Sequence, residues 1–341
     1  MDKITYEELR QEINQEKTIN VPNVEKVIEQ LLQTDIVDED FEDLDYAYSP
    51  RKKLRELAYL FNNMDLKVYG TADNIHNCAV PYAKENMYDC ACIILKRGLE
   101  ELDAAIDLLA DYIRYGICCG KYRECEEFYN CLNEIPKKEW NWRAFSFSLD
   151  YLLDKLNRTR EKRERSTLKR IVKKLSNEFV IIIGNDQAYF DKAQVLKTFG
   201  NDNTETEESV LYAGINSLKV APRCALRLSD ILFERGEYKE AAELLKRCCI
   251  NAFKPQPDIN SGYSFLLSAL CKTSHLFDEH SDGNFKESKD TVLDLYKDFN
   301  TAIESGLASI YRGTANTAIK IVAAQTEFEY PYTNVNDPYD F

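Results

Sequence analysis

Glycine and proline are scarce in this sequence, with 12 and 9 residues among 341. A fold of many short strands depends on these two residue types for its turns. Their scarcity argues against such a fold and favours long helices joined by short connections. The length is sufficient for two globular domains or for one long solenoid.

Histidine is rarer still, with three residues in the whole chain. General-base catalysis and nucleophile activation by histidine therefore have few candidates. His275 and His280 are five residues apart, so they do not share a helical face as a pair four apart would. A glycine-rich phosphate loop is also lacking, because Gly120 and Lys121 are not followed by Ser or Thr. We therefore expect no catalytic residue, no cofactor and no enzymatic activity.

Long apolar runs are missing as well. No stretch of about 18 consecutive apolar residues occurs, so we expect no membrane span. The N-terminus, Met1–Glu8, has no apolar signal core.

The 11 cysteines form an odd set that includes adjacent residues, which pair poorly with each other. We interpret them as free thiols of a cytoplasmic protein, used as small core residues.

One group of residues has the right chemistry for zinc but the wrong spacing. His76, Cys78, Cys90 and Cys92 are ligand types that zinc accepts. Residues two apart on a helix point about 200° away from each other, however. We therefore expect these cysteines to be core residues and the chain to have no metal site.

Charge is distributed unevenly along the chain, whose formal net charge is −14. Residues 35–45 hold seven acidic side chains, which is typical of a solvated loop, with a docking site for a basic segment as the alternative. Residues 155–174 hold ten basic and two acidic side chains on a predicted helix. The basic face comprises Arg158, Arg160, Arg163, Arg165, Lys169 and Arg170. Three interpretations remain open for it: a solvated or internally paired face, a site for an acidic protein, or a site for nucleic acid.

Three segments share a turn pattern between two amphipathic helices. The clearest runs from Gly236 through Tyr238 to Ala241, with apolar residues before and after it at helical spacing. A second copy begins at Gly120 and a weaker third copy at Gly283, so that the glycines are 116 and 47 residues apart. Glycine closes a helix at low steric cost, and a small residue lets two helices approach closely.

This pattern resembles the tetratricopeptide repeat (TPR) family, whose repeats recur every ~34 residues. The resemblance implies an all-α fold, an irregular TPR-like right-handed α-solenoid of helical hairpins. It divides the chain into an N-terminal helical region (1–97), a helical-repeat solenoid (98–327) and an aromatic, acidic tail (328–341). We place a helix break near Gly98. The apolar run Phe179–Ile183 is expected to be the buried end of a helix.

Members of the family bind ligands on the concave face, which the first helix of each hairpin lines. Alignment on the three glycines gives candidate partner-binding positions on this face: Asp107, Arg114, Arg223, Asp230, Phe233 and His280. Some members hold a partner's C-terminal carboxylate there with lysines and asparagines. This chain lacks those residue types at the aligned positions, so a carboxylate clamp is not expected.

The function that this resemblance implies is binding of a protein or peptide by a cytoplasmic scaffold or adaptor. The alternatives are a nucleic-acid-associated protein that uses the basic helix, and a regulatory protein that senses a ligand. Trp140 and Trp142 precede that helix; they would stack on bases or belong to the core. The tail holds five aromatic residues, which a disordered segment usually avoids. We predict that part of the tail packs on the solenoid. The alternative is that the tail is a flexible peptide to which another protein binds.

Overall fold

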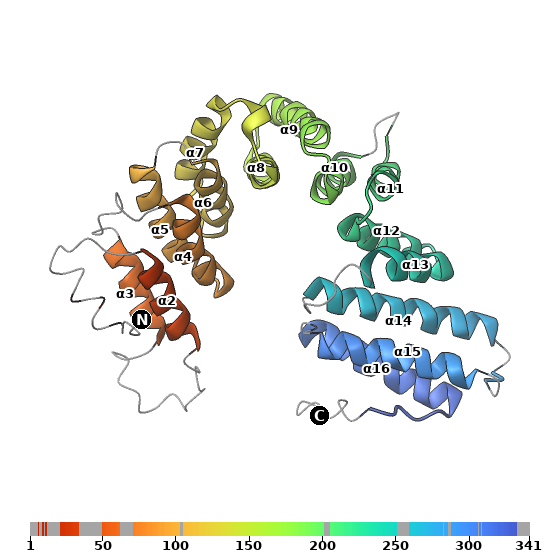
Figure 1. Cartoon of the computed structure of the whole chain (residues 1–341). Helices are drawn as coiled ribbons and strands as arrows, with labels where there is room; N and C mark the ends of the chain where they lie inside the picture. Colours follow the sequence, from red (N-terminus) through yellow and green to blue (C-terminus); the bar gives the residue numbers. More distant parts are fainter. Residues whose placement is uncertain are drawn as a thin grey trace. The chain divides into compact units, whose positions relative to one another are not determined.

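The protein is an all-helical chain whose helices pack on their sequence neighbours (Figure 1). The computed structural model describes residues 6, 9, 11, 21–33, 50–61, 71–102, 105–200, 205–250, 259–281, 283–285, 288–305, 307 and 309–332. The chain divides into two compact units, Met1–Ile183 and Gly184–Phe341.

The described residues of unit 1 include α2 to α9 and the short 3-10 helix η3. The elements are α2 (Val21–Gln33), α3 (Pro50–Leu60), α4 (Ala72–Lys84), α5 (Tyr88–Glu101), α6 (Ile106–Cys118), α7 (Tyr122–Glu134), η3 (Lys137–Glu139), α8 (Trp142–Arg158) and α9 (Lys162–Ile182). Helices α4 and α5, α6 and α7, and α8 and α9 pack as successive hairpins. The first helices of these hairpins also contact one another, α4 against α6 and α6 against α8.

Unit 2 repeats this arrangement with α10 to α16. The elements are α10 (Asp186–Phe199), α11 (Glu207–Ser217), α12 (Pro222–Glu234), α13 (Tyr238–Leu245), η4 (Lys246–Ile250, one turn of π-helix), α14 (Ile259–Glu279), α15 (Lys289–Glu304) and α16 (Ser309–Thr326). The pairs α10–α11, α12–α13 and α14–α15 are hairpins, and α16 packs on α14 and α15. The all-α series of hairpins that the sequence pattern predicts is confirmed.

The glycine at each predicted turn has a left-handed backbone. Gly120, Gly236 and Gly283 have φ values of 76°, 82° and 78°, a region that residues with a Cβ seldom enter. At Gly236 the amide of Glu237 donates to Leu232 O at 2.9 Å, and Gly236 N donates to Phe233 O at 3.0 Å. This pair of bonds is the Schellman motif, which satisfies the last carbonyls of α12 and turns the chain into α13.

A fourth copy of the turn lies at Asn86, between α4 and α5, and sequence inspection did not find it. Asn86 takes φ 57°, and Met87 N donates to Tyr82 O at 2.8 Å in the same Schellman geometry. Tyr88 follows two residues after Asn86, as Tyr122 follows Gly120. Asn86 and Gly120 are 34 residues apart, which is the period of the TPR family. The repeat was missed because asparagine, which also tolerates a left-handed backbone, replaces glycine.

Small residues mark the close contacts between helices. Ala241 is fully buried in the α12–α13 hairpin, where its carbonyl accepts from Ser229 Oγ at 3.4 Å. Gly98 is buried inside α5, and an added Cβ would lie 2.7 Å from Ile75 Cδ1 of α4. The predicted helix break at Gly98 is therefore wrong. This glycine permits a close approach to α4 and does not end the helix.

Two other expectations concern ends of elements. In the run Phe179–Ile183, Phe179 is buried against Phe145, but Ile181 is 80% exposed, so the expected burial of the whole run is wrong.

In the tail, Phe328, Tyr330 and Tyr332 pack on the hydrophobic cluster of α14, α15 and α16, as predicted for part of the tail. Residues 35–45 and 333–341 lie outside the described residues, so the acidic segment and the rest of the tail are not assigned a structure.

Candidate functional site

A chain of polar contacts crosses the first-helix face of unit 1, which α4, α6 and α8 form. Asp111 of α6 is at its centre, with a side chain 2% exposed. Its Oδ2 lies 2.5 Å from His76 Nδ1 of α4 and accepts from Arg143 Nη1 of α8 at 3.3 Å. Arg143 Nη2 lies 3.0 Å from Asp107 Oδ1, which also accepts from Asn141 Nδ2 at 2.6 Å. We call these five residues the polar bridge.

The sequence builds this bridge by helical spacing and by one cap. Asp107 and Asp111 are four residues apart on α6 and thus share the face that meets α8. Asn141 is the N-cap of α8, where its Oδ1 accepts from Ala144 N at 3.0 Å. The side chain of the cap thereby starts α8 and holds it to α6. Because a buried carboxylate is costly without partners, the bridge fixes α4, α6 and α8 in register.

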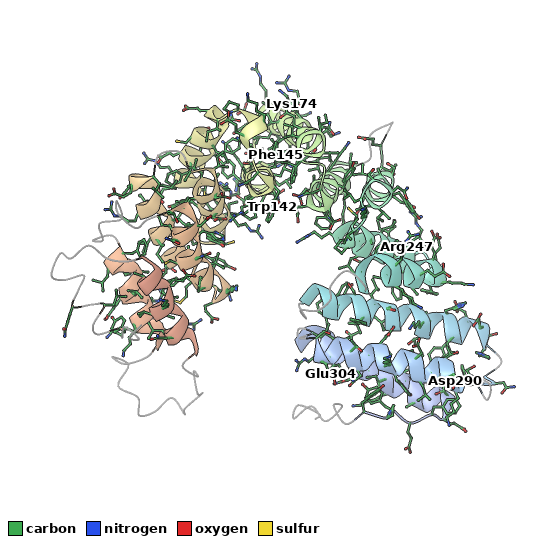
Figure 2. All side chains as sticks on the ribbon, in the orientation of Figure 1. Trp142, Phe145, Lys174, Arg247, Asp290 and Glu304 are labelled. Carbon is green, nitrogen blue, oxygen red and sulfur yellow. The ribbon has the colours of Figure 1, made fainter. Side chains whose placement is uncertain are left out.

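An exposed aromatic surface lies beside the polar bridge. Trp142 is 41% exposed, and its ring lies edge-on to Phe147 with 6.1 Å between centroids. The guanidinium of Arg114 lies 5.8 Å from the Phe147 ring and donates to Asp150 Oδ2 at 2.6 Å. Trp142 lies on the side of α8 away from Lys174 of α9 (Figure 2). We call Trp142, Phe147, Arg114 and Asp150 the aromatic platform.

Electrostatics on the platform are set by partial burial. Burial raises the pKa of the Asp150 carboxyl, and the nearby Arg114 guanidinium opposes that shift. Burial also raises the pKa of Tyr115 to about 12, assisted by the carboxylate of Asp111. At neutral pH the Tyr115 hydroxyl therefore stays protonated and can donate a hydrogen bond. The face offers a guanidinium, a phenol and an indole together, which are group types enriched in binding hot spots.

The predicted positions Asp107 and Arg114 both belong to this face, one in the bridge and one in the platform. In unit 2, the backbone amide of Arg223 donates to Asp186 Oδ2 at 2.9 Å at the start of α12. Asp230 accepts from Tyr263 of α14 at 3.1 Å. Burial raises the pKa of Asp230, and the hydrogen bond from Tyr263 opposes that shift.

Two predicted positions lie at hairpin ends. Phe233 packs edge-on against Tyr238 across the Gly236 turn, with 5.3 Å between centroids. His280 directly follows α14, and its Nε2 lies 2.7 Å from Ser288 Oγ in the α14–α15 connection. Its ring also packs against Phe285. His280 was chosen by alignment on Gly283. It is three residues before that glycine and therefore lies in the turn and not on α14. The partner-binding roles of all six positions stay predictions.

The six side chains of the basic face have different surroundings. Arg158 pairs with Asp154 at 2.7 Å and covers the Tyr122 ring at 3.7 Å. Arg165 donates to the carbonyls of Leu156 and Thr159, which end α8. Lys169, Arg160, Arg163 and Arg170 are exposed on or just before α9. The expectation of an internally paired face therefore holds for Arg158 and Arg165.

The two tryptophans have different environments. Trp140 is buried, and its Nε1 donates to the carbonyls of Leu132 and Ile135. Trp142 is exposed on the platform, two residues further along the chain.

Sequence inspection did not assign four residues of the polar bridge to the site: His76, Asp111, Asn141 and Arg143. The available signal was a row of charged residues on α6, at Asp107, Asp111 and Arg114, with spacings of four and three. Such a row keeps charge on one face of the helix, which indicates that the face meets polar groups of a neighbour.

The described residues contain no group of three or more His, Cys, Asp and Glu side chains placed to hold a metal ion. His76 is engaged with Asp111, while Cys78, Cys90 and Cys92 are buried and outside any disulfide. None of the helices in the described part of the chain has both the length and the hydropathy needed to cross a bilayer.

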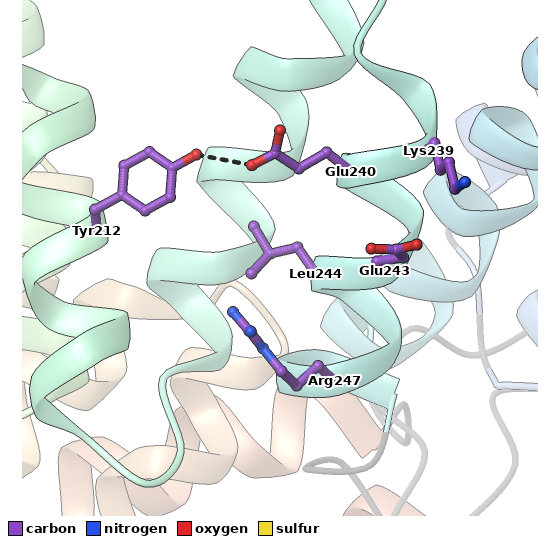
Figure 3. Close-up of a pocket in the computed structure, with 6 residues that line it drawn as sticks. All are labelled: Tyr212, Lys239, Glu240, Glu243, Leu244 and Arg247. Atoms are coloured by element: carbon purple, nitrogen blue, oxygen red, sulfur yellow. Dashed lines mark hydrogen bonds between the residues drawn. The ribbon is translucent and has the colours of Figure 1, made fainter.

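Two surface hollows are lined by second helices of hairpins. The larger, of about 660 Å³, is lined by Tyr212, Lys239, Glu240, Glu243, Leu244 and Arg247. Tyr212 of α11 donates to Glu240 of α13 at 3.2 Å across it (Figure 3). The smaller, of about 380 Å³, is lined by Ile93, Lys96, Glu100, Lys121 and Glu124. Both mix cations and carboxylates along their walls, so neither selects a ligand of one charge.

The hairpins, their left-handed turn residues and the 34-residue interval define a TPR-like helical repeat protein. Among solved structures, the chain is similar to the crystal structure of a thermophilic TPR protein from Thermus thermophilus. The two are 13% identical with a TM-score of 0.45, over 60% of this chain and 100% of that chain. No protein-family model and no curated protein matches the sequence.

Proposed function

We propose that the protein is a scaffold that binds a protein or peptide on the first-helix face of α4, α6 and α8. The observation that carries this proposal is the exposed Trp142, held beside Phe147 and Arg114 on a face whose helices the polar bridge fixes in register. A large exposed aromatic ring next to a guanidinium is the combination on which protein interfaces concentrate binding energy. A preformed face also reduces the ordering that a partner must cause on binding.

The chemistry of the site suits recognition. Its central carboxylate, Asp111, is already engaged by His76 and Arg143. The groups that keep exposed surface are the indole of Trp142, the guanidinium of Arg114 beside its partner Asp150, and, in part, the ring of Tyr115. These groups can stack, donate hydrogen bonds and exclude water, which suits a peptide with an apolar anchor and a nearby carbonyl or carboxylate.

The test is a capture experiment with paired variants. The intact protein, the W142A/R114A variant and a Y59A/R123A control are each used to capture partners from a lysate of the source cells, after circular dichroism has shown equal helicity. Tyr59 and Arg123 are an exposed aromatic residue and an exposed arginine on α3 and α7. We expect a discrete protein to bind the wild type and the control, and to be lost from W142A/R114A. A partner that all three retain would contradict the proposed site.

A further inference from the structure

One stripe of α9 points away from the hydrophobic core of unit 1. Arg163, Arg170, Lys174 and Ile181 follow one another at intervals of seven, four and seven residues, so they share one helical face. The opposite face carries the buried side chains of α9, such as Phe179. Lys174 extends from the outer side of α9, away from Phe145 (Figure 2). We call these four residues the outer stripe.

The outer stripe is unusual because its arginine side chains have no partner among the residues that the structure describes. Within the described part of the chain, the arginine side chains without an ion pair or a hydrogen bond are those of Arg51, Arg160, Arg163 and Arg170. The next basic residue of the stripe, Lys174, lies 3.6 Å from Glu178. In a chain with a net charge of −14, carboxylates are abundant, yet among the described residues none neutralises Arg163 or Arg170. An acidic group from outside can therefore pair with Arg163 and Arg170 without displacing a described carboxylate.

The stripe ends in an apolar residue that the fold leaves in water. Ile181 is 80% exposed, the most exposed of the large hydrophobic residues in the described part of the chain. The distance along the helix from Arg163 to Ile181 is roughly 27 Å at 1.5 Å per residue. A linear arrangement of cations with an apolar end matches one face of another helix better than it matches a folded acidic surface.

We propose that the outer stripe of α9 docks an acidic amphipathic helix of a partner protein. The docking helix carries carboxylates at spacings of seven and four residues, opposite Arg163, Arg170 and Lys174, and an apolar side chain seven residues beyond them, opposite Ile181. This surface is separate from the aromatic platform and does not depend on the proposed function. Charge complementarity supplies encounter rate and register, and the isoleucine contact supplies apolar burial.

Nucleic acid fits the same stripe less well. Single-stranded nucleic acid is bound by basic grooves with aromatic side chains on which bases stack. The aromatic residue of α9 is Phe179, which is buried, and Trp142 lies on the side of α8 away from Lys174. A long polyanion would also extend beyond the stripe over a protein of net charge −14, which repels it. An acidic helix as short as the stripe avoids this repulsion.

The experiment measures binding of fluorescent probes to the intact protein at low salt by anisotropy. The first probe is a helical peptide with three glutamates spaced seven and four residues apart and a leucine seven residues further on. The second has the same composition in scrambled order, and the third is a single-stranded oligonucleotide. The variant R163E/R170E/K174E is compared with K138E/K219E/K289E, which makes the same charge change at other exposed residues.

The proposal expects the ordered peptide to bind at least about tenfold more tightly to the wild type than to R163E/R170E/K174E, as the loss of three exposed pairs implies. The lysine control should bind like the wild type, the scrambled peptide should bind more weakly, and I181S should reduce ordered-peptide affinity. Equal binding to both triple variants, or binding of the oligonucleotide but not of the peptide, would overturn the proposal. So would peptide binding that occurs only after the acids of residues 35–45 are changed to amides, because the occupant would then be this chain's own segment.

Discussion

Arg143 of α8 donates to Asp111 of α6 over 3.3 Å, and the Asp111 side chain is 2% exposed. A carboxylate this buried depends on its partners, so R143M should lower the free energy of unfolding by roughly 2–4 kcal/mol. His76 remains as the second partner and limits the loss. Urea unfolding followed by circular dichroism measures the effect.

R123M is the matched control for this prediction, because Arg123 is 94% exposed in its pair with Glu127 and should matter little. The double variant R143M/D111L should recover part of the lost stability, because it removes the buried carboxylate of Asp111, which R143M leaves without its arginine. Equal stability of R143M and R123M would show that the polar bridge does not hold the helices together.

Close packing of α6 on α7 at Gly116 leads to a second prediction. A Cβ added at Gly116 would lie 2.5 Å from Cys125 Sγ, so G116A should destabilise the protein by about 1–3 kcal/mol despite the better helix propensity of alanine. Gly313 lies inside α16 with no atom near its added Cβ, so G313A should stabilise by about 0.5–1 kcal/mol. Urea midpoints of both variants test this contrast. In a C125A background the cost of G116A should disappear; its persistence there would contradict the assigned clash.

The sequence predicted the helical hairpins because their signals are local. Gly120 and Gly236 occupy backbone conformations that favour glycine, and the apolar stripes of α12 and α13 have helical spacing. The Asn86 turn was missed because the same conformation is open to a second residue type. Gly98 was misread because its role is a contact with Ile75, which lies on another helix and is invisible to a local rule.

The candidate site was only partly predictable for the same reason. Asp107 and Arg114 were found by alignment on the turn glycine, since both lie on α6. Their partners Asn141 and Asp150 belong to the N-cap and the body of α8. The sequence of α6 or of α8 alone does not indicate that these two helices are in contact. Trp140 and Trp142 lie on either side of the start of α8, where the change in chain direction leaves the first buried and the second exposed.

Buried thiols predict a loss of stability at alkaline pH. Burial raises the pKa of Cys90 to about 11 and of Cys125, Cys249 and Cys271 to about 12. In the unfolded chain a thiol titrates near ~8.5, so above that pH the folded state holds protons that the unfolded state has released. The stabilisation is therefore complete below about pH 8.5 and is lost as pH rises toward the folded pKa values.

The measurement is the urea midpoint at several pH values between roughly 7.5 and 10.5, a range that spans the ordinary thiol pKa, and the midpoint should fall steadily. Lys137 acts in the opposite direction, because burial lowers its pKa to about 8, but it is one group against several thiols. A C90A/C125A variant should lose less stability than the wild type over this range, after allowance for its lower starting value. A midpoint that stays level or rises with pH would refute the assignment of these thiols as buried and protonated.

The first residues of the tail should stabilise the end of unit 2. Tyr296 of α15 donates to Phe328 O at 2.8 Å, and its ring meets Tyr330 edge-on with 5.1 Å between centroids. A chain that ends at Glu327 exposes this aromatic contact and should lose roughly 1–3 kcal/mol of stability. Hydrogen exchange should show the loss in α15 and α16, because the tail contacts that part of the unit. A chain that ends at Tyr332 keeps Phe328, Tyr330 and Tyr332 and is the control. If both truncations protect α15 and α16 as well as the full chain does, the aromatic residues of the tail serve a partner and not the fold.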